Sequence, residues 1–349
     1  NFPFFVRGRA GELDELCRGL QNAAVGDSTR LPLSLSARPQ SKDAVEIDIV
    51  NPLTRPFDGS ISLAQGKLEK LELPPKGRTR LKYIRKNIIP DNKVGDIAIP
   101  VRITQKGGKA QDSTFTFLAC AANYVKPGSI KLDASIEDWQ GIPSISMTGY
   151  STDVSGGKIA SPAKNNFKVN YRVAWNPQTI YLLVEVDDTA FAVDHSKKDP
   201  LYWYAKSGVQ LFIDTLGDAP VKARSNVIGY DENDYSYELL PSEDGRSAVV
   251  YRRVAPDTQL TGGVFNGLMP GVLEPGVKVA FRNSGGKQVY EAEFPARYLQ
   301  PLSLAGGVSF GLGIKVYDHS GKTTVKNVPA KLKLFRSPHN YPLLLLNGK

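Results

Sequence analysis

The chain has 349 residues and a net charge of +9, with 41% hydrophobic and 23% charged residues. This length predicts more than one domain, and the composition is that of a soluble globular protein. No apolar run approaches the roughly 18 residues of a membrane span, and a chain with only 3 histidines argues against a hydrolytic triad or a histidine-rich metal site.

Residues 1–36 are predicted to be a helical stub or the end of a preceding domain. Leu13, Leu16 and Leu20 recur at intervals of three and four, which gives one apolar stripe along a short helix. The chain shows no signal peptide and begins with Asn1, so we expect a mature form or a piece of a longer protein.

Two further features concern cysteine and positive charge. Cys17 and Cys120 make no metal-ligand spacing, and we expect both to be unpaired and mostly buried. Residues 76–86 contain six Lys or Arg and no acid, and such a surface attracts polyanions. No nucleic-acid-binding motif accompanies this charge, so nucleic acid is not an expected partner. The simplest explanation of the charge is that these side chains lie on strand faces exposed to solvent. The alternative is that they bind an anionic polysaccharide.

Residues 37–124 are predicted to form a β-sandwich. Val45, Ile47 and Ile49 alternate with Glu46 and Asp48, as in a strand with one buried face. Further strand-like segments follow at intervals of about eight to twelve residues, with Pro and Gly between them, which is typical of sandwiches. The turn after the first strand resembles the Ig-like accessory domains of large bacterial carbohydrate-active enzymes.

Residues 125–349 are predicted to form a second β-sandwich. Two strand-like segments flank Asn176, Pro177 and Gln178, a tight connection that predicts a hairpin. Six similar segments follow, and the only helix-like piece is about one turn near residue 297. The expected fold class is therefore all-β, with two β-sandwich domains in series after a short N-terminal helix.

Ordered motifs in this second region resemble the family 9 carbohydrate-binding modules. The motifs are "IKLDASIEDWQG", "YRVAWNPQTIYLLVEVDDTAF", "YWYAKSGVQLFIDT", "VYEAEFPARYLQP", "FGLGIKVYDHSG" and "LFRSPHNYPLLLL", in that order. The resemblance covers roughly residues 128–349. It implies a sugar-binding module rather than an enzyme.

The resemblance also implies a binding site built on aromatic rings. Two tryptophans of the family clamp the terminal sugar. The family spacing places the first on Tyr204, and a slip of one residue places it on Trp203, which is the residue we expect. The second falls on Phe335, which offers less stacking area than Trp and no N–H donor. Gln210 stands where the family usually carries Glu, and loss of that charge would suit an anionic ligand.

Polar contacts are implied at two further places. Arg336 and Asn340 occupy the polar side of the closing segment, and Arg can bind vicinal hydroxyls or a carboxylate with its planar fork. The segment that holds Asn233, Asp234 and Tyr237 is where the family contributes additional polar contacts.

Other candidate residues are better explained by structure. Trp139 and Trp175 are predicted to be core residues at the ends of the sandwich. Asp187 and Asp188 could contribute to a structural calcium site of the kind some family members carry, but a turn is the better explanation of a lone acid pair. Ser309 lies in a G-x-S-x-G match, but strand-like residues follow it instead of the helix that a nucleophile elbow requires.

The sequence therefore predicts non-catalytic binding of a polysaccharide or oligosaccharide, with no cofactor apart from a possible structural calcium. Aromatic stacking and polar contacts would target an attached or preceding catalytic domain to its polymer, outside the cell, in the periplasm or at the cell surface. One alternative is a structural or adhesive spacer whose sugar site has decayed, as the departures at Gln210 and Phe335 would suit. A haem-binding electron-transfer module is another, with Met147 or Met269 as the available ligands.

Overall fold

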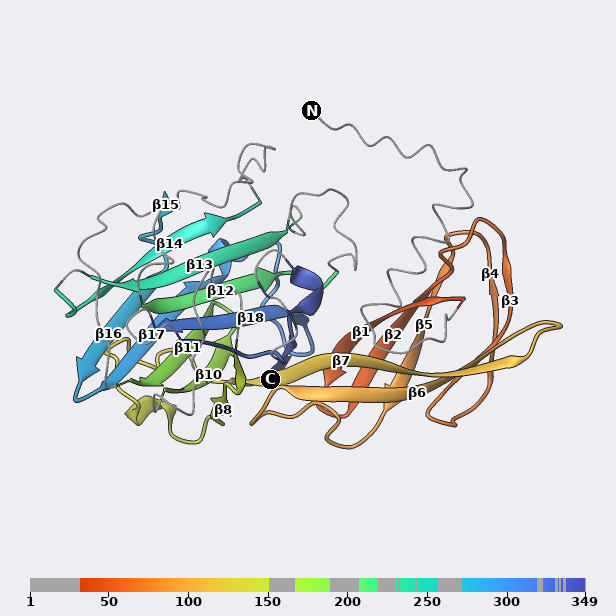
Figure 1. Cartoon of the computed structure of the whole chain (residues 1–349), viewed down its shortest axis with the longest axis horizontal. Helices are drawn as coiled ribbons and strands as arrows, with labels where there is room; N and C mark the ends of the chain where they lie inside the picture. The colour runs from red at the N-terminus through yellow and green to blue at the C-terminus, as the bar shows by residue number, and fades with distance from the viewer. Residues whose placement is uncertain are drawn as a thin grey trace, which may run out of the picture. The chain divides into compact units, whose positions relative to one another are not determined.

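The computed structural model describes residues 32–150, 167–188, 207–218, 230, 233–242, 244–256, 272–318, 323–329, 332, 334 and 337–348. Regular structure in these ranges consists of strands and short 3-10 turns (Figure 1), so the all-β prediction is confirmed. No helix in the same ranges is long and apolar enough to cross a membrane. The chain forms two compact units, and β7 contributes residues to both.

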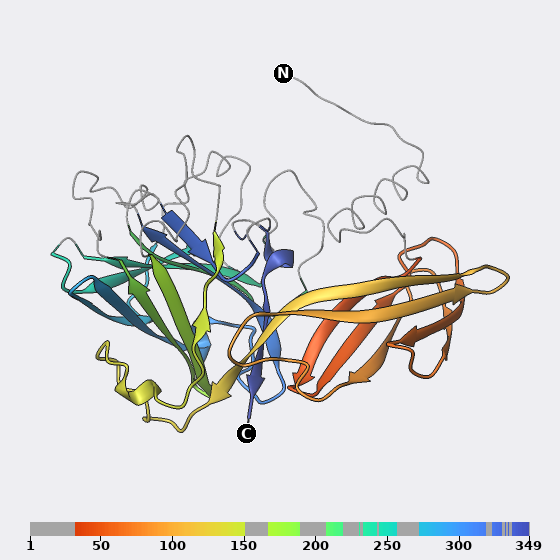
Figure 2. The same cartoon turned by 60° about the horizontal axis from the view of Figure 1, so that its bottom comes forward.

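Unit 1 contains the described residues 32–38, 44–85 and 96–117. Its strands are β1 (Ser34–Ser41), β2 (Ala44–Val50), β3 (Phe57–Leu63), β4 (Glu69–Leu73), β5 (Arg78–Ile84), β6 (Gly95–Gln105) and the first part of β7 (Ala110–Tyr124). β1, β2 and β5 form one sheet, while β3 pairs with both β4 and β6. Figure 2 shows β6 and β7 running side by side as a long hairpin.

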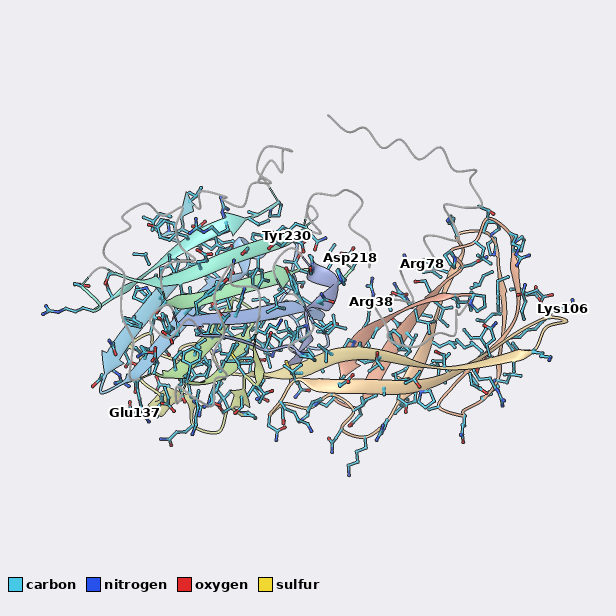
Figure 3. All side chains as sticks on the ribbon, in the orientation of Figure 1. Arg38, Arg78, Lys106, Glu137, Asp218 and Tyr230 are labelled. Atoms are coloured by element: carbon cyan, nitrogen blue, oxygen red, sulfur yellow. The ribbon has the colours of Figure 1, made fainter. Side chains whose placement is uncertain are left out.

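The basic segment of the sequence lies on β5, where its side chains alternate with half-buried ones. Asp48 is 1% exposed, and its carboxylate accepts from Arg80 Nε at 2.7 Å and pairs with Arg38 Nε at 2.9 Å. Arg78 adds a third guanidinium at 3.9 Å (Arg38 and Arg78 are labelled in Figure 3). Part of the positive charge is therefore used inside unit 1 to neutralise one buried carboxylate.

Unit 2 contains residues 39–43 and 86–95 and all described residues from Leu118 onward. We call β8–β10–β11–β17–β16 the β11 sheet and β15–β14–β13–β12–β18–β19–β9 the β12 sheet; in both, neighbours in the name are antiparallel pairs. The strands are β8 (Ile145–Ser146), β9 (Gly149–Tyr150), β10 (Lys168–Asn176), β11 (Thr179–Asp187), β12 (Gly208–Asp214), β13 (Asp234–Pro241), β14 (Ala248–Val254), β15 (Val272–Leu273), β16 (Lys278–Ser284), β17 (Lys287–Pro295), β18 (Ser309–Asp318), β19 (Thr323–Lys326) and β20 (Leu343–Asn347).

β20 joins the two sheets of unit 2 through β7. It pairs antiparallel with β18 and parallel with residues 119–123 of β7, and the end of β7 pairs parallel with β10. Trp175 donates its indole N–H to the Asn347 carbonyl at 3.1 Å and is 1% exposed. The predicted core role of Trp175 is confirmed.

The main core of unit 2 lies between the two sheets. On β12 the residues Val209, Leu211 and Ile213 face it, together with Leu182 and Val184 of β11. Successive side chains of a strand point to opposite faces of the sheet. Gln210, Phe212 and Asp214 of β12 therefore lie on the outer face of the β12 sheet. That outer face is also buried over β12.

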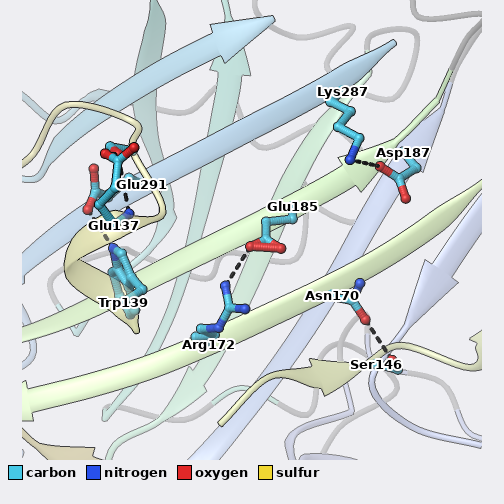
Figure 4. Close-up of polar contacts among 10 residues, drawn as sticks. Glu137, Trp139, Ser146, Asn170, Arg172, Glu185, Asp187, Lys287 and Glu291 are labelled. Atoms are coloured by element: carbon cyan, nitrogen blue, oxygen red, sulfur yellow. Dashed lines mark hydrogen bonds and ion pairs between the residues drawn. The ribbon is translucent and has the colours of Figure 1, made fainter. Parts of the chain in front are cut away.

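The outer face of the β11 sheet is covered over part of its length by residues 130–142. Trp139, in the 3-10 turn η1 (Glu137–Trp139), packs there against Leu183 and Tyr181. Figure 4 shows the fixing contact, in which Glu291 accepts from Trp139 Nε1 at 2.7 Å. The same carboxylate accepts the backbone N–H of Ala134 at 2.8 Å, so the core role predicted for Trp139 is confirmed.

Most strand predictions match the structure closely, including β2 and β12 and the hairpin at Asn176. The short strands β8, β9 and β15, and also β19, carried no strand prediction, and β1 begins at Ser34, inside the segment predicted as a helical stub or the end of a preceding domain. Cys120 is buried and free as expected, while Cys17 and the N-terminal helix lie outside the described residues. The domain boundaries expected near residues 36 and 124 stay predictions, and so does the Ig-like character of the first domain.

Candidate functional site

Five residues form a polar row across the outer face of the β12 sheet. Gln210 of β12 lies directly opposite Glu238 of β13 on one side and Lys315 of β18 on the other. The row continues to Tyr251 of β14 and Lys326 of β19. Directly opposed residues share a face and have neighbouring side chains, so the row brings an amide, a carboxyl, two amines and a phenol together.

Glu238 forms a buried ion pair with Arg253. Its Oε2 accepts from Arg253 Nε at 2.8 Å and lies 2.6 Å from Arg253 Nη2, and both side chains are almost fully buried. A bulge between Ser236 and Tyr237 leaves Arg253 without a directly opposed residue. Burial raises the pKa of Glu238 to about 7, against the lowering effect of Arg253. Oε1 of Glu238 has no hydrogen-bond partner among the described residues.

Gln210 is held by a tyrosine at the end of β18. Its side-chain oxygen accepts a hydrogen bond from the Tyr317 hydroxyl, and Gln210 itself is 1% exposed. The ammonium group of Lys315 lies 4.8 Å from the centre of the Tyr317 ring, a cation–π contact. Tyr317 is half-buried, so it connects the buried row to the surface.

Lys315 and Lys326 are neighbouring like charges in a buried setting. They face each other across β18 and β19 and are 9% and 2% exposed. Lys326 Nζ donates to the carbonyl of Leu332. Lysine side chains are seldom buried this deeply in folded proteins. The pair places two cationic side chains in the same row as Gln210.

An apolar patch lies next to the polar row on the same face. Phe212 packs against Tyr341 with ring centres 5.8 Å apart, and Leu334 belongs to the same cluster. The 3-10 turn η6 (Pro338–Asn340) lies against β12 and β18, because Gly313 leaves room for the closing segment. The structure therefore brings Asn340 to the same sheet face as Gln210.

The other predicted site residues either lie outside the described ranges or lie away from Gln210. Trp203, Tyr204, Phe335 and Arg336 lie outside the described residues. Tyr237 is fully buried in the core between the sheets and donates to the Tyr298 carbonyl at 2.6 Å, so it is not brought together with Gln210.

Asp234 is 0% exposed and lies opposite Asp214. Asn233 accepts from the Thr215 hydroxyl at 3.2 Å and donates to Asp218. These contacts hold the turn after β12, at the end of that strand away from Tyr317.

The predictions missed Glu238 and Arg253. Lys315 and Lys326 stand out in the sequence as members of a basic group, but they were not predicted as site residues. The alternation of β13 could have shown that Glu238 shares a face with Gln210, since the strand pattern was already visible. No local signal in the sequence predicts the bulge that admits Arg253.

The described residues show no site for the structural calcium or the haem that the sequence analysis considered. No group of three or more His, Cys, Asp or Glu that could hold a metal ion occurs in those ranges. Asp187 pairs with Lys287 at 3.9 Å, and Asp188 is buried at the end of β11. Met147 is a core residue, and Ser309 begins a strand rather than a nucleophile elbow.

A family model described as "Carbohydrate family 9 binding domain-like" matches residues 136–332, more than half of the chain. The chain belongs to this family, which confirms the resemblance in the motifs. No curated protein matches the chain.

Several solved structures are similar to it. A carbohydrate binding module of family 9 from Caldicellulosiruptor kristjanssonii, in complex with cellotriose, is 15% identical with a TM-score of 0.45, covering 66% of this chain and 93% of that one. A structure from the same organism in complex with glucose is 14% identical with a TM-score of 0.43, covering 66% and 96%. A proposed carbohydrate-binding protein from Bacteroides uniformis ATCC 8492 is 14% identical with a TM-score of 0.42, covering 65% and 98%.

Proposed function

We propose that this chain is a non-catalytic carbohydrate-binding protein whose site is the outer face of the β12 sheet at the end marked by Tyr317. Its family membership supports the proposal. The observation that carries it is the row in which Glu238, Gln210 and Lys315 lie side by side across three strands. Planar and charged groups at one strand end can serve the hydroxyls of a sugar, and aromatic rings can cover its C–H face.

The ligand we propose is an anionic polysaccharide or oligosaccharide, such as a polyuronate. The pair Lys315 and Lys326 supports this, because two cationic side chains on neighbouring strands of one sheet face attract a carboxylate or sulfate. Gln210 adds a neutral donor and acceptor where a carboxylate would repel such a ligand. Tyr317 is the half-buried member that a ligand can reach, and the buried residues fix its orientation and the local charge.

The biological role we propose is targeting. Stacking by Trp203 or Tyr204 and by Phe335, with polar contacts from Arg336 and Asn340, would hold the end of a polysaccharide. An attached or associated catalytic domain would then act at a raised local concentration of its polymer. We accordingly propose that the protein acts outside the cell, in the periplasm or at the cell surface.

The test is a glycan array followed by calorimetric titration with oligouronates and their neutral counterparts. We expect Lys315→Met to weaken oligouronate binding about tenfold or more and to leave neutral sugars nearly unchanged, since a charge about 8 Å from the ligand contributes about 2 kcal/mol at an effective dielectric constant of about 20. Lys278→Met, a change of an exposed lysine on β16, is the matched control. Equal uronate affinity in all three proteins would contradict the anionic ligand, and Trp203→Ala tests the stacking contact in the same assay.

A structural or adhesive spacer is the second candidate function. The observation that favours it is the low exposure of Gln210, at 1%, and of Lys326, at 2%, because residues this inaccessible cannot touch a ligand without an opening of the face. No binding to any glycan by the unmodified chain would make this the better account.

A further inference from the structure

The outer face of the β11 sheet carries a pocket on the opposite side of unit 2 from the Gln210 row. Residues 130–142 cover this face up to the row that contains Glu291, where Trp139 is fixed. Beyond that row the sheet is hollowed into a pocket of about 490 Å³. Small-ligand sites typically measure about 300–1,000 Å³, so the pocket has room for one or two sugar rings.

The floor of this pocket is a second cross-strand row. Asn170 of β10 lies opposite Glu185 of β11, which lies opposite Val289 of β17, which in turn lies opposite Arg282 of β16. An apolar side chain is thus bracketed by a carboxamide, a carboxylate and a guanidinium. Ile136 adds an apolar wall and is 46% exposed.

Two of the polar groups are held in place by neighbours. Arg172 Nη1 donates to Glu185 Oε1 at 2.5 Å, and the Ser146 hydroxyl donates to Asn170 Oδ1 at 2.6 Å; Figure 4 shows both contacts. Each leaves a bonding position unused, since the described residues provide no partner for Asn170 Nδ2 or Glu185 Oε2. Fixed groups with unused positions bind a ligand at lower entropic cost than mobile ones.

The charges of the pocket are nearly balanced. Glu185 and Asp187 face Arg172 and Lys287 in ion pairs of 2.5 Å and 3.9 Å, and Arg282 adds one further guanidinium to the lining. This balance gives an anion little advantage, unlike the lysine pair on the other sheet. Planar groups around an apolar floor instead match the hydroxyls and the C–H face of an uncharged sugar.

We propose that this pocket, lined by Asn170, Glu185, Val289 and Arg282, is a second ligand site that takes a neutral sugar or the terminal unit of a neutral oligosaccharide. It is separate from the site of the proposed function. Two sites on opposite sheets would let one chain hold two glycan segments at once.

The test is to titrate the ¹⁵N-labelled full chain with glucose and with cellotriose and to monitor the backbone amide chemical shifts by NMR. We expect saturable shifts on β10, β11, β16 and β17, weakened about fivefold or more in both Asn170→Ala and Arg282→Ala, a loss of the order expected for one hydrogen bond. Lys278→Ala removes a charge from the same strand and face as Arg282 but outside the pocket, and it should titrate like the unmodified chain.

Arg282 is exposed and has no hydrogen bond to a described residue, so its removal leaves the fold intact. Shifts confined to the β12 sheet, or unchanged titrations in both variants, would overturn the second site. Oligouronate binding should stay unaltered in the same two variants. That readout separates this proposal from the proposed function, because each can fail while the other holds.

Discussion

Glu238 lies between Gln210 and Arg253 with its carboxyl group fully buried. Burial disfavours the ionised form, and the single ion pair only partly offsets this effect, so the pKa of Glu238 rises from 4.5 to about 7. Between these two values the folded chain keeps a proton that the unfolded chain has released. The contribution of this group to stability is therefore complete below the lower value and falls as the pH rises through the upper one.

We expect this group to make the free energy of unfolding fall by about 2–3 kcal/mol between pH 5 and pH 8, at about 1.4 kcal/mol for each unit of pKa shift. Glu238→Gln cannot release the proton and should lack this component. The measurement is urea denaturation of both proteins at the two pH values. A stability difference between them that is the same at pH 5 and pH 8 would show that the carboxyl titrates normally.

At the element scale, two glycines of β18 allow the closing segment to pack against the β12 sheet. A Cβ built at Gly313 would lie 2.9 Å from Leu334 Cδ2, 3.2 Å from Tyr341 Cδ1 and 3.3 Å from Phe212 Cβ. At Gly311 the nearest atoms would be Asp214 Cβ at 3.1 Å and Tyr341 Cβ at 3.3 Å. The position of η6 and Asn340 thus depends on the absence of these side chains.

We expect Gly313→Ala to lower the free energy of unfolding by about 1–3 kcal/mol, because the added methyl group overpacks a buried cluster. It should also shift the ring resonances of Tyr341. Ser303→Ala, a change at an exposed position, should stay within about 0.5 kcal/mol of the unmodified chain. Equal stability of the two variants would mean that the closing segment is free to move away from β18.

The strands were predictable because most bury one face and therefore alternate. β2 and β12 match their predicted limits, and both carry alternating branched side chains that face a core. β1 was missed because "SLSARPQS" holds one large apolar residue and a proline. Gln210 was found through the family motif, whereas the lysine pair depends on which strands are neighbours in the sheet, and local sequence does not encode that.

For the whole molecule, β7 matters because the fold of unit 2 includes it. Residues 119–123 of β7 pair with β20, and Cys120 and Ala122 lie in the main core. Tyr124 packs edge-on against Trp175 with ring centres 5.5 Å apart. A fragment of unit 2 that lacks β7 loses both the partner strand and these core contacts.

We therefore expect a fragment of residues 125–349 to unfold at least about 10 °C below a fragment of residues 110–349, or to fail to fold. The loss of a buried partner strand exceeds the few kcal/mol that correspond to such a shift. Differential scanning calorimetry of the two fragments beside the full chain is the measurement. Matching transitions in both fragments would show that β20 needs no parallel partner.

The pairing of β7 with β20 also has a consequence for synthesis of the chain. Cys120 of β7 faces Leu344 of β20, and about 220 residues separate them in the sequence. At a translation rate of about 5–20 residues per second, roughly 10–45 s pass between the appearance of the two strands. Through that interval residues 119–122 present an unpaired strand edge beside the nascent core, and such an edge is open to pairing with other chains. The newly made protein therefore stays open to misassembly at this edge until β20 has been synthesised and has paired with it.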